Sequence, residues 1–140
     1  MNWMLELVVV PVADQDRAKD FYVGKLGWSL IVDHRAGEEF RVVQVVPPGS
    51  GCAIALMRNP DAAGSLQGLH LVVNDIEAAR SELIGNKVEV SELFHFEDGA
   101  QLPGADAERR DYNTFFSFTD PDGTGWMVQE VDRGNAPAHQ

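Results

Sequence analysis

The 140-residue sequence contains a single cysteine and only half as many basic as acidic residues. Because Cys52 stands alone, an internal disulfide and a metal cluster built on several thiolates are excluded. Eleven lysines and arginines stand against 22 aspartates and glutamates, which gives a formal net charge of −11. A chain with this charge repels polyanions, so we do not expect nucleic acid as a partner.

Long apolar runs are also missing. The longest ones have the length of a strand, far below the roughly 20 residues needed to cross a bilayer. The stretch MNWMLELVVVPV lacks the basic start and the small-residue cleavage site of a secretory signal. The GSG segment at 49–51 opens no helix, so it does not form a phosphate-binding loop. We therefore expect a cytoplasmic protein with no membrane partner.

A hydrophobic content of 44% is enough for one domain to bury a core. The first half of the chain predicts a strand, a helix and three more strands, from its β-branched runs and turn compositions. The expected strands span 4–12, 28–35, 38–46 and 51–57. The helix is expected to begin after Asp14, which stands at the N-cap, and to end at Gly27.

The same order begins again in the second half, with a helix that Asp75 can cap 61 residues after Asp14 (75 − 14 = 61). The expected strands are 68–74, 87–96, 111–119 and 125–131, with a long loop at 97–110 and the turn DPDG before the last strand. We predict a single α+β domain of two tandem βαβββ modules. Module one spans 3–58, a connector 59–66, module two 67–132, and a flexible tail 133–140.

Three motifs at matching separations carry a family resemblance that covers nearly the whole chain. They are PVADQDRAKDFYVGKLGW after the first strand, LVVNDIEAARSEL in the second module, and DPDGTGW before the last strand. The chain resembles the vicinal oxygen chelate superfamily, in its glyoxalase and bleomycin-resistance branch. The resemblance implies that each module curls its sheet into half a cup, with helices outside and a small organic ligand inside. It also implies a homodimer.

One histidine, His70, lies inside an apolar strand of module two. Alternation along this strand separates two sets of side chains: Leu69, Leu71 and Val73, and Gly68, His70 and Val72. The apolar set should face the helix, so His70 is expected on the cup face. Three roles stay open for it: an interior histidine with no catalytic duty, a ligand-contacting or proton-transferring group, and a metal ligand.

The resemblance implies metal ligands on the first and last strands of each module. Seven residues before the helix-capping aspartates stand Leu7 and Gly68, and the strand at 51–57 carries no donor side chain. The last strand offers Gln129 on the cup face, and a one-residue bulge would exchange it with Glu130.

A divalent ion needs several converging donors, so we predict no metal and no cofactor. The minority alternative is a divalent metal held by His70 with help from Gln44 or Glu130. Without a metal, the glyoxalase and extradiol dioxygenase reactions lose their Lewis acid, and we do not expect them here.

The remaining polar and aromatic side chains predict a mixed pocket. The expected ligand-binding residues are Gln44, His70, Phe94, Tyr112, Phe116, Trp126 and Gln129. The loop at 97–110 is long enough to cover such a site. Ordinary core packing is the competing reading for Phe116, and a clamp at the sheet end for Trp126. Arg109 and Arg110 are most simply solvated charges that balance local acids.

Two function classes compete, and a protein-interaction role with a collapsed cup is a third. In the first, the chain binds a small organic molecule without changing it. In the second, it is a lyase or isomerase acting on a small carbonyl compound, metal-independent or with an atypical metal site, in which His70 or His95 takes a proton from the carbon next to the carbonyl.

Overall fold

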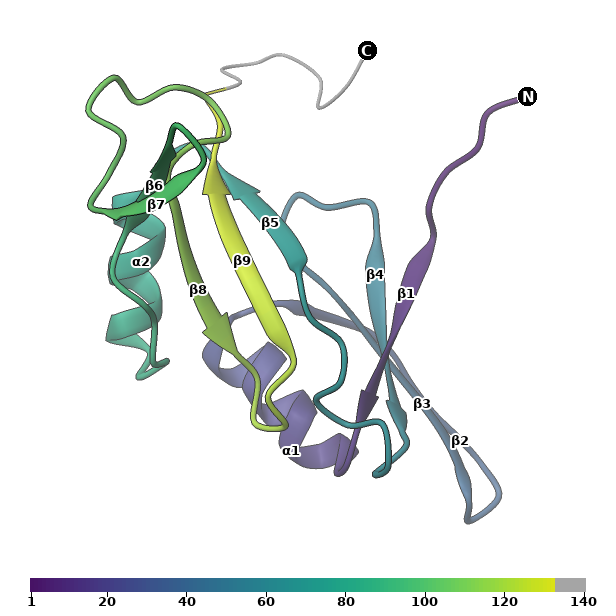
Figure 1. Cartoon of the computed structure of the whole chain (residues 1–140). Coiled ribbons are helices and arrows are strands. Elements are labelled where there is room, and N and C mark those ends of the chain that lie inside the picture. The colour runs from purple at the N-terminus through teal and green to yellow at the C-terminus, as the bar shows by residue number, and fades with distance from the viewer. Residues whose placement is uncertain (133–140) are drawn as a thin grey trace. The chain divides into compact units, whose positions relative to one another are not determined.

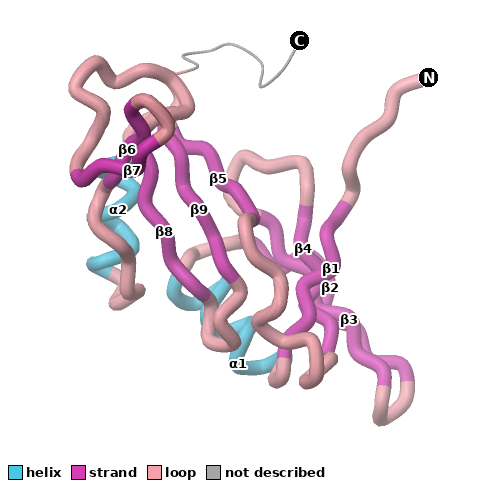
Figure 2. The backbone as a smooth tube through the Cα atoms, viewed as in Figure 1, coloured by secondary structure: helices cyan, strands magenta, loops and turns pink. Residues whose placement is uncertain are grey.

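The computed structural model describes residues 1–132, and the predicted tail at 133–140 lies outside the described residues. The chain divides into two compact units (Figure 1). Unit one comprises Met1–Gln67 and the turn Asp120–Thr124, and unit two comprises Gly68–Thr119 and the chain from Gly125 onward. Strands supply most of the regular structure in both (Figure 2), so the α+β class is confirmed.

Unit one contains a four-stranded mixed sheet in the order β1-β4-β3-β2, in which β1 is parallel to β4 and the other pairs are antiparallel. Its strands are β1 (Leu7–Val12), β2 (Ser29–Ala36), β3 (Phe40–Val46) and β4 (Ala53–Arg58). A short helix α1 (Gln15–Lys19) continues as the π-helix η1 (Asp20–Lys25). The Oδ1 atom of Asp14 accepts a hydrogen bond from the Arg17 backbone N–H at 3.0 Å, so the predicted N-cap is confirmed.

One face of this sheet is buried beneath α1. Val10, Val43 and Leu56 lie side by side in register on that face and are fully buried. The Gln15 amide fastens the helix to the sheet by donating to the backbone oxygens of Arg41 and Leu56, each at 2.8 Å. The opposite face of the sheet is left uncovered within unit one.

Unit two contains a five-stranded mixed sheet in the order β5-β9-β8-β6-β7. Its strands are β5 (Leu69–Val73), β6 (Phe94–Glu97), β7 (Ala100–Pro103), β8 (Phe115–Thr119) and β9 (Gly125–Glu130). The helix α2 (Ile76–Gly85) buries Ile76 completely against the sheet. The Oδ1 atom of Asp75 accepts from the Ala78 backbone N–H at 3.1 Å, which confirms the second predicted N-cap.

The prediction for residues 87–103 was wrong in two respects. Of the predicted strand 87–96, only the part from Phe94 pairs with neighbouring strands. Part of the predicted loop at 97–110 forms β7, which returns beside β6. Asp98 and Gly99 connect the two strands with φ of +50° and +81°, as a type I′ turn requires. Asp-Gly between strand-like residues is the signal that predicts such a hairpin, so the sequence did contain it.

The segment before β6 is irregular for a physical reason. Lys87 has a φ of +64°, which leaves the extended region at the start of the predicted strand. The Ser91 hydroxyl accepts a hydrogen bond from the Ser117 backbone N–H at 2.9 Å. In a regular strand pair this N–H would donate to a backbone carbonyl, so the side chain replaces a backbone partner. Within residues 1–132, no helix has the length and apolarity that crossing a membrane requires.

Candidate functional site

The face of sheet two that α2 does not cover is the candidate site, and we call it the open face of unit two. Register places two rows of side chains on it. The first row is His70, Met127 and Ser117, and the second is Val72, Gln129, Phe115 and Phe94. His70 is exposed while Leu69 and Leu71 are partly buried, as strand alternation predicts.

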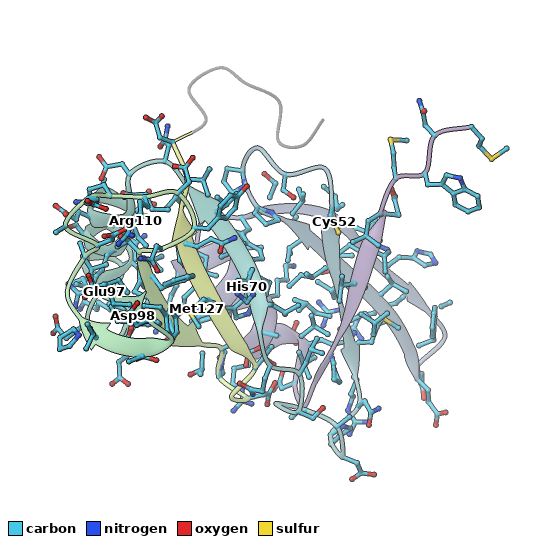
Figure 3. The ribbon with its side chains drawn as sticks, turned by 45° about the horizontal axis from the view of Figure 1, so that its top comes forward. Cys52, His70, Glu97, Asp98, Arg110 and Met127 are labelled. Atoms are coloured by element: carbon cyan, nitrogen blue, oxygen red, sulfur yellow. The ribbon has the colours of Figure 1, made fainter. Side chains whose placement is uncertain are left out.

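A hollow of about 590 Å³ lies on this face, bordered by β8, β9, the segment before β6 and the β6–β7 hairpin. Its lining residues are Ser91, Glu92, Leu93, Phe94, Gln101, Leu102, Pro103, Ser117 and Met127. Met127 and Ser117 belong to both the hollow and the first row, and His70 pairs with Met127 in the adjacent strand. Figure 3 shows His70 and Met127 on these neighbouring strands. The hollow and the histidine therefore form one continuous surface.

The orientation of His70 is fixed by its own strand. Its Nδ1 atom lies 2.6 Å from the carbonyl oxygen of Gly68. A carbonyl oxygen can only accept a hydrogen bond, so Nδ1 carries the proton. In the neutral imidazole, Nε2 then has a free lone pair. Gly68 has a φ of +79°, a conformation that favours glycine, and its backbone turns the carbonyl toward the ring.

Two more polar groups on the open face lack partners. Within residues 1–132, neither the Ser117 hydroxyl nor the Gln129 amide has a hydrogen bond, although both are partly buried. Their neighbours Phe115, Val72 and Met127 are apolar. Polar groups on such a face that have no partner within the protein can bond to a ligand or to water.

Phe94 and Phe115 form an aromatic wall next to these groups. Their rings stack with centroids 5.5 Å apart, and Phe96 meets Phe115 edge-on at the same separation. Such contacts fix the ring positions and leave an apolar surface at the hollow. Phe94 therefore lies where the sequence placed it, on the cup side of module two.

Phe116 and Trp126 are not on this face, which corrects their expected placement. They alternate with Phe115 and Met127 and point to the side that α2 covers, where they are 0% and 5% exposed. Trp126 stacks on Phe118 with centroids 6.2 Å apart. The helix-covered face needs large apolar side chains, and these residues supply them.

The other predicted residues also lie elsewhere. His95 points to the opposite side of β6 from Phe94, with Nδ1 2.7 Å from the Gly104 oxygen and Nε2 4.0 Å from the Glu97 carboxylate. Tyr112 lies in the loop before β8 and is about half exposed. Gln44 lies on the uncovered face of sheet one, in unit one, beside Ala55 and Val32.

Glu130 faces away from the candidate site. Its carboxylate accepts from Nε and Nη2 of Arg109 at 2.9 and 2.8 Å and from the Ile76 backbone N–H at 3.0 Å. The Arg109 guanidinium holds the pKa of Glu130 below its usual range. The register of β9 has no bulge, so Gln129, and not Glu130, is on the open face.

Arg109 and Arg110 are exposed, as the prediction of solvated charges requires, and each also pairs with a carboxylate that is far less exposed. Arg110 pairs through Nε and Nη2 with the carboxylate of Asp106, at 2.8 and 3.0 Å, and Asp106 is 2% exposed. The Arg110 guanidinium lowers the pKa of Asp106. The sequence offered one signal for this, the four-residue spacing of the two groups, and none for the pairing of Arg109 with Glu130.

The residues present do not fit the metal site that the family resemblance implies. The two rows of the open face offer one imidazole, one amide and one hydroxyl, without a carboxylate, and Glu130 is bound to Arg109. Within residues 1–132, no three His, Cys, Asp or Glu side chains are grouped so that they could hold a metal ion. A hard divalent ion prefers carboxylate oxygens, so this donor set does not suit one.

Comparison with known proteins gives one family. A family model described as the Glyoxalase/Bleomycin resistance protein/Dioxygenase superfamily matches residues 5–128. TnmS3, an antibiotic binding protein from Streptomyces sp. CB03234, is 30% identical, with 92% of this chain and 96% of that chain covered and a TM-score of 0.72. A superfamily member from Sphaerobacter thermophilus DSM 20745 is 27% identical over 93% and 98% of the two chains, also with a TM-score of 0.72. Protein YetH of Bacillus subtilis (strain 168) is 26% identical over 123 residues, 88% of this chain and 94% of YetH.

Proposed function

The chain belongs to the Glyoxalase/Bleomycin resistance protein/Dioxygenase superfamily, and from this membership we propose that it binds a small organic molecule on the open face of unit two, without a metal ion. The observation that carries the proposal is a set of polar groups with no partner in residues 1–132, beside a hollow of mixed lining. Ser117, Gln129 and Nε2 of His70 lie in two rows whose other side chains are apolar. This is the composition of a small-molecule site.

The dimensions of the hollow support this proposal. A volume of about 590 Å³ lies within the roughly 300–1,000 Å³ of ordinary ligand pockets. The apolar lining, including Leu93, Phe94 and Met127, supplies affinity by removing ligand surface from water. The likeness to TnmS3, which is described as an antibiotic binding protein, agrees with a ligand of drug-like size.

The charge of the protein limits the charge that its ligand can carry. Among residues 1–132, Glu92 is the one charged residue that lines the hollow, and the chain carries a formal net charge of −11. An anion would meet repulsion both at the rim and at long range. We therefore propose a neutral or cationic ligand and no nucleotide. The cytoplasmic location expected from the sequence stays a prediction.

A screen of neutral and cationic aromatic compounds by thermal shift, followed by NMR mapping, tests the proposal. We expect hits to perturb the amide signals of Ser117, Met127 and His70, and to be recovered unchanged by mass spectrometry. Perturbations confined to sheet one would contradict the site. If the native protein converts a compound to a product and His70→Ala does not, the alternative function is supported, which is acid–base catalysis on a carbonyl compound. The free Nε2 of His70 favours this alternative.

We also propose a homodimer joined through the N-terminal arm, defined as residues 1–5. Trp3 is 90% exposed and Met4 89%. The arm precedes β1, which is an edge strand of its sheet. Side chains of this size present on the order of 600 Å² together, close to the roughly 800 Å² per partner of a stable interface. The arm has no charged side chain, so a second, equally acidic copy can contact it with less repulsion than elsewhere.

A further inference from the structure

His70 carries information about the ligand that goes beyond the presence of a site. We propose that Nε2 of His70 accepts a hydrogen bond from the ligand, and that the ligand is a neutral aromatic compound bearing a hydroxyl group. This inference rests on the proposed function, because it specifies the chemistry of the same site. It depends on the contacts of His70, on the composition of the first row, and on the absence of a carboxylate in that row.

The protonation pattern of the ring is set locally. The 2.6 Å contact joins Nδ1 to the oxygen of Gly68, two residues earlier in the same segment. Since that oxygen has no proton to give, the contact exists only when Nδ1 is the donor. The neutral ring is thereby fixed as the Nδ1–H tautomer. No long-range contact is needed, so the tautomer is in place before a ligand arrives.

The lone pair on Nε2 meets no donor from the side chains next to His70. The neighbours of His70 in the rows are Met127 and Val72, and neither side chain carries an N–H or O–H. Within residues 1–132, Nε2 makes no hydrogen bond. A ligand that approaches this nitrogen is favoured when it brings an O–H or N–H group, and disfavoured when it brings a carbonyl or an anion.

The floor of the row favours an aromatic ring. The thioether of Met127 lies between His70 and Ser117 and borders the hollow. Sulfur makes favourable contacts with ring edges, and the stacked pair Phe94 and Phe115 adds a second aromatic surface. A ring resting on Met127 brings a substituent within reach of Nε2.

The first row also favours a hydroxyl group on the ligand over an ammonium group. A cation taken out of water needs a carboxylate beside it, and the first row has none. Glu92 lines the hollow, but it is largely exposed and pairs with Arg80 at 3.5 Å. A neutral hydroxyl makes the same bond to Nε2 with a smaller desolvation cost. The inferred ligand class is therefore a phenol or a related hydroxylated aromatic.

The test compares 2-naphthol with 2-methoxynaphthalene, which has the same ring system but no donor. At about pH 7.5 we expect the full chain to bind 2-naphthol between about three- and tenfold more tightly than the methyl ether. In His70→Phe the ratio should fall to about one, with binding of the methyl ether retained. Isothermal titration calorimetry measures both affinities.

His95→Phe is the matched control. His95 has the same kind of contact, from Nδ1 to a backbone oxygen, but it points to the other side of β6. We expect this variant to keep the preference for 2-naphthol. If it loses the preference as His70→Phe does, the assignment to His70 is overturned.

Direct observation of the tautomer supplies a readout that needs no ligand. Long-range 1H–15N spectra distinguish the two neutral tautomers, and the signal lost in His70→Phe identifies the residue. The Nδ1–H form is expected, and the Nε2–H form overturns the inference. If both naphthalenes bind equally, the inference fails and the proposed function stands. If neither these probes nor any screened compound binds, both fail.

Discussion

The uncovered face of sheet one and the open face of unit two are built on corresponding strands, yet they differ in chemistry. Val9 and His70 hold the same place in the two halves, because the offset of 61 residues that relates the helix caps also relates them (70 − 9 = 61). Val9 pairs with Ala55, and Ala55 with Gln44. His70 pairs with Met127, and Met127 with Ser117. One row thus has a single amide among apolar groups, and the other has an imidazole and a hydroxyl.

The buried faces do not differ in this way. In both units the helix begins at an aspartate cap and covers a face of large apolar side chains. Folding requires burial on that face, since its apolar area supplies most of the stability. The uncovered faces carry no such requirement, so their side chains are free to serve a ligand. The two halves therefore share a frame and differ in the chemistry of their uncovered faces.

The sharpest way to break this comparison is to fill each face with the same large side chain. Met127→Trp should obstruct the hollow and weaken binding of a screened ligand by more than about tenfold, which corresponds to roughly 1.4 kcal/mol. Met57→Trp is the matched variant, because Met57 lies on the uncovered face of sheet one and is likewise partly buried. Calorimetry should find its affinity within about twofold of the native value. Equal losses would mean that both faces contribute to the site.

A second prediction concerns assembly, where unit one carries the N-terminal arm. Replacing Trp3 and Met4 by serine should convert the dimer to a monomer at micromolar concentration, as sedimentation velocity measures. Ile84→Ser removes an exposed apolar side chain from α2 in unit two and should leave the dimer intact. A native protein that sediments as a monomer would refute the proposed interface.

Stability should depend more on the buried carboxylate of unit two than on the surface cluster of unit one. Asp106 is 2% exposed, whereas Asp33 pairs with Arg41 and Lys19 at the surface. Asp106→Asn removes the buried charge that pairs with Arg110 at 2.8 Å, and we expect Tm to fall by on the order of 5 °C or more. Asp33→Asn should have a smaller effect. Differential scanning calorimetry at about pH 7 compares them, and a larger loss in Asp33→Asn would reverse the ranking.

The two arginine-paired carboxylates of unit two, Asp106 and Glu130, also predict how stability changes with pH. The pKa values of Asp106 and Glu130 are lowered in the folded protein by Arg110 and Arg109. A carboxyl whose pKa is lower in the folded state stabilises fully above its unfolded value of about 4. This contribution is lost as the pH falls through the folded pKa values. The Tm difference between the native chain and Asp106→Asn should therefore shrink below about pH 4, and a constant difference would contradict the assignment.

The smallest effect is expected where the two units are alike. Asp14→Ala and Asp75→Ala each remove an N-cap hydrogen bond of about 3 Å, and each should lower the free energy of unfolding by roughly 1 kcal/mol. Urea denaturation measures both. A difference of more than about twofold between the variants would show that the two helices do not contribute equally.

Local signals in the sequence determined the parts of the fold that short segments encode. The two aspartate caps, the alternation that puts His70 on the open face and the turn before β9 all depend on a few consecutive residues. The repeated order of elements and three motifs gave the α+β class and the family. The prediction missed the β6–β7 hairpin, although the dipeptide Asp98-Gly99 is typical of such a turn. The acidic composition of the segment indicated a loop instead.

The tertiary structure alone decided what depends on long-range contacts. Alternation showed that Phe116 and Phe115 face opposite ways, but only the position of α2 decides which of the two faces the helix covers. The pairing of Arg109 with Glu130 joins residues that no sequence period relates. The hollow exists because β7 returns beside β6 near Met127, many residues away. Backbone preferences act over a few residues and can be predicted from them, whereas the position of a face or a cavity depends on which distant segments pack against it.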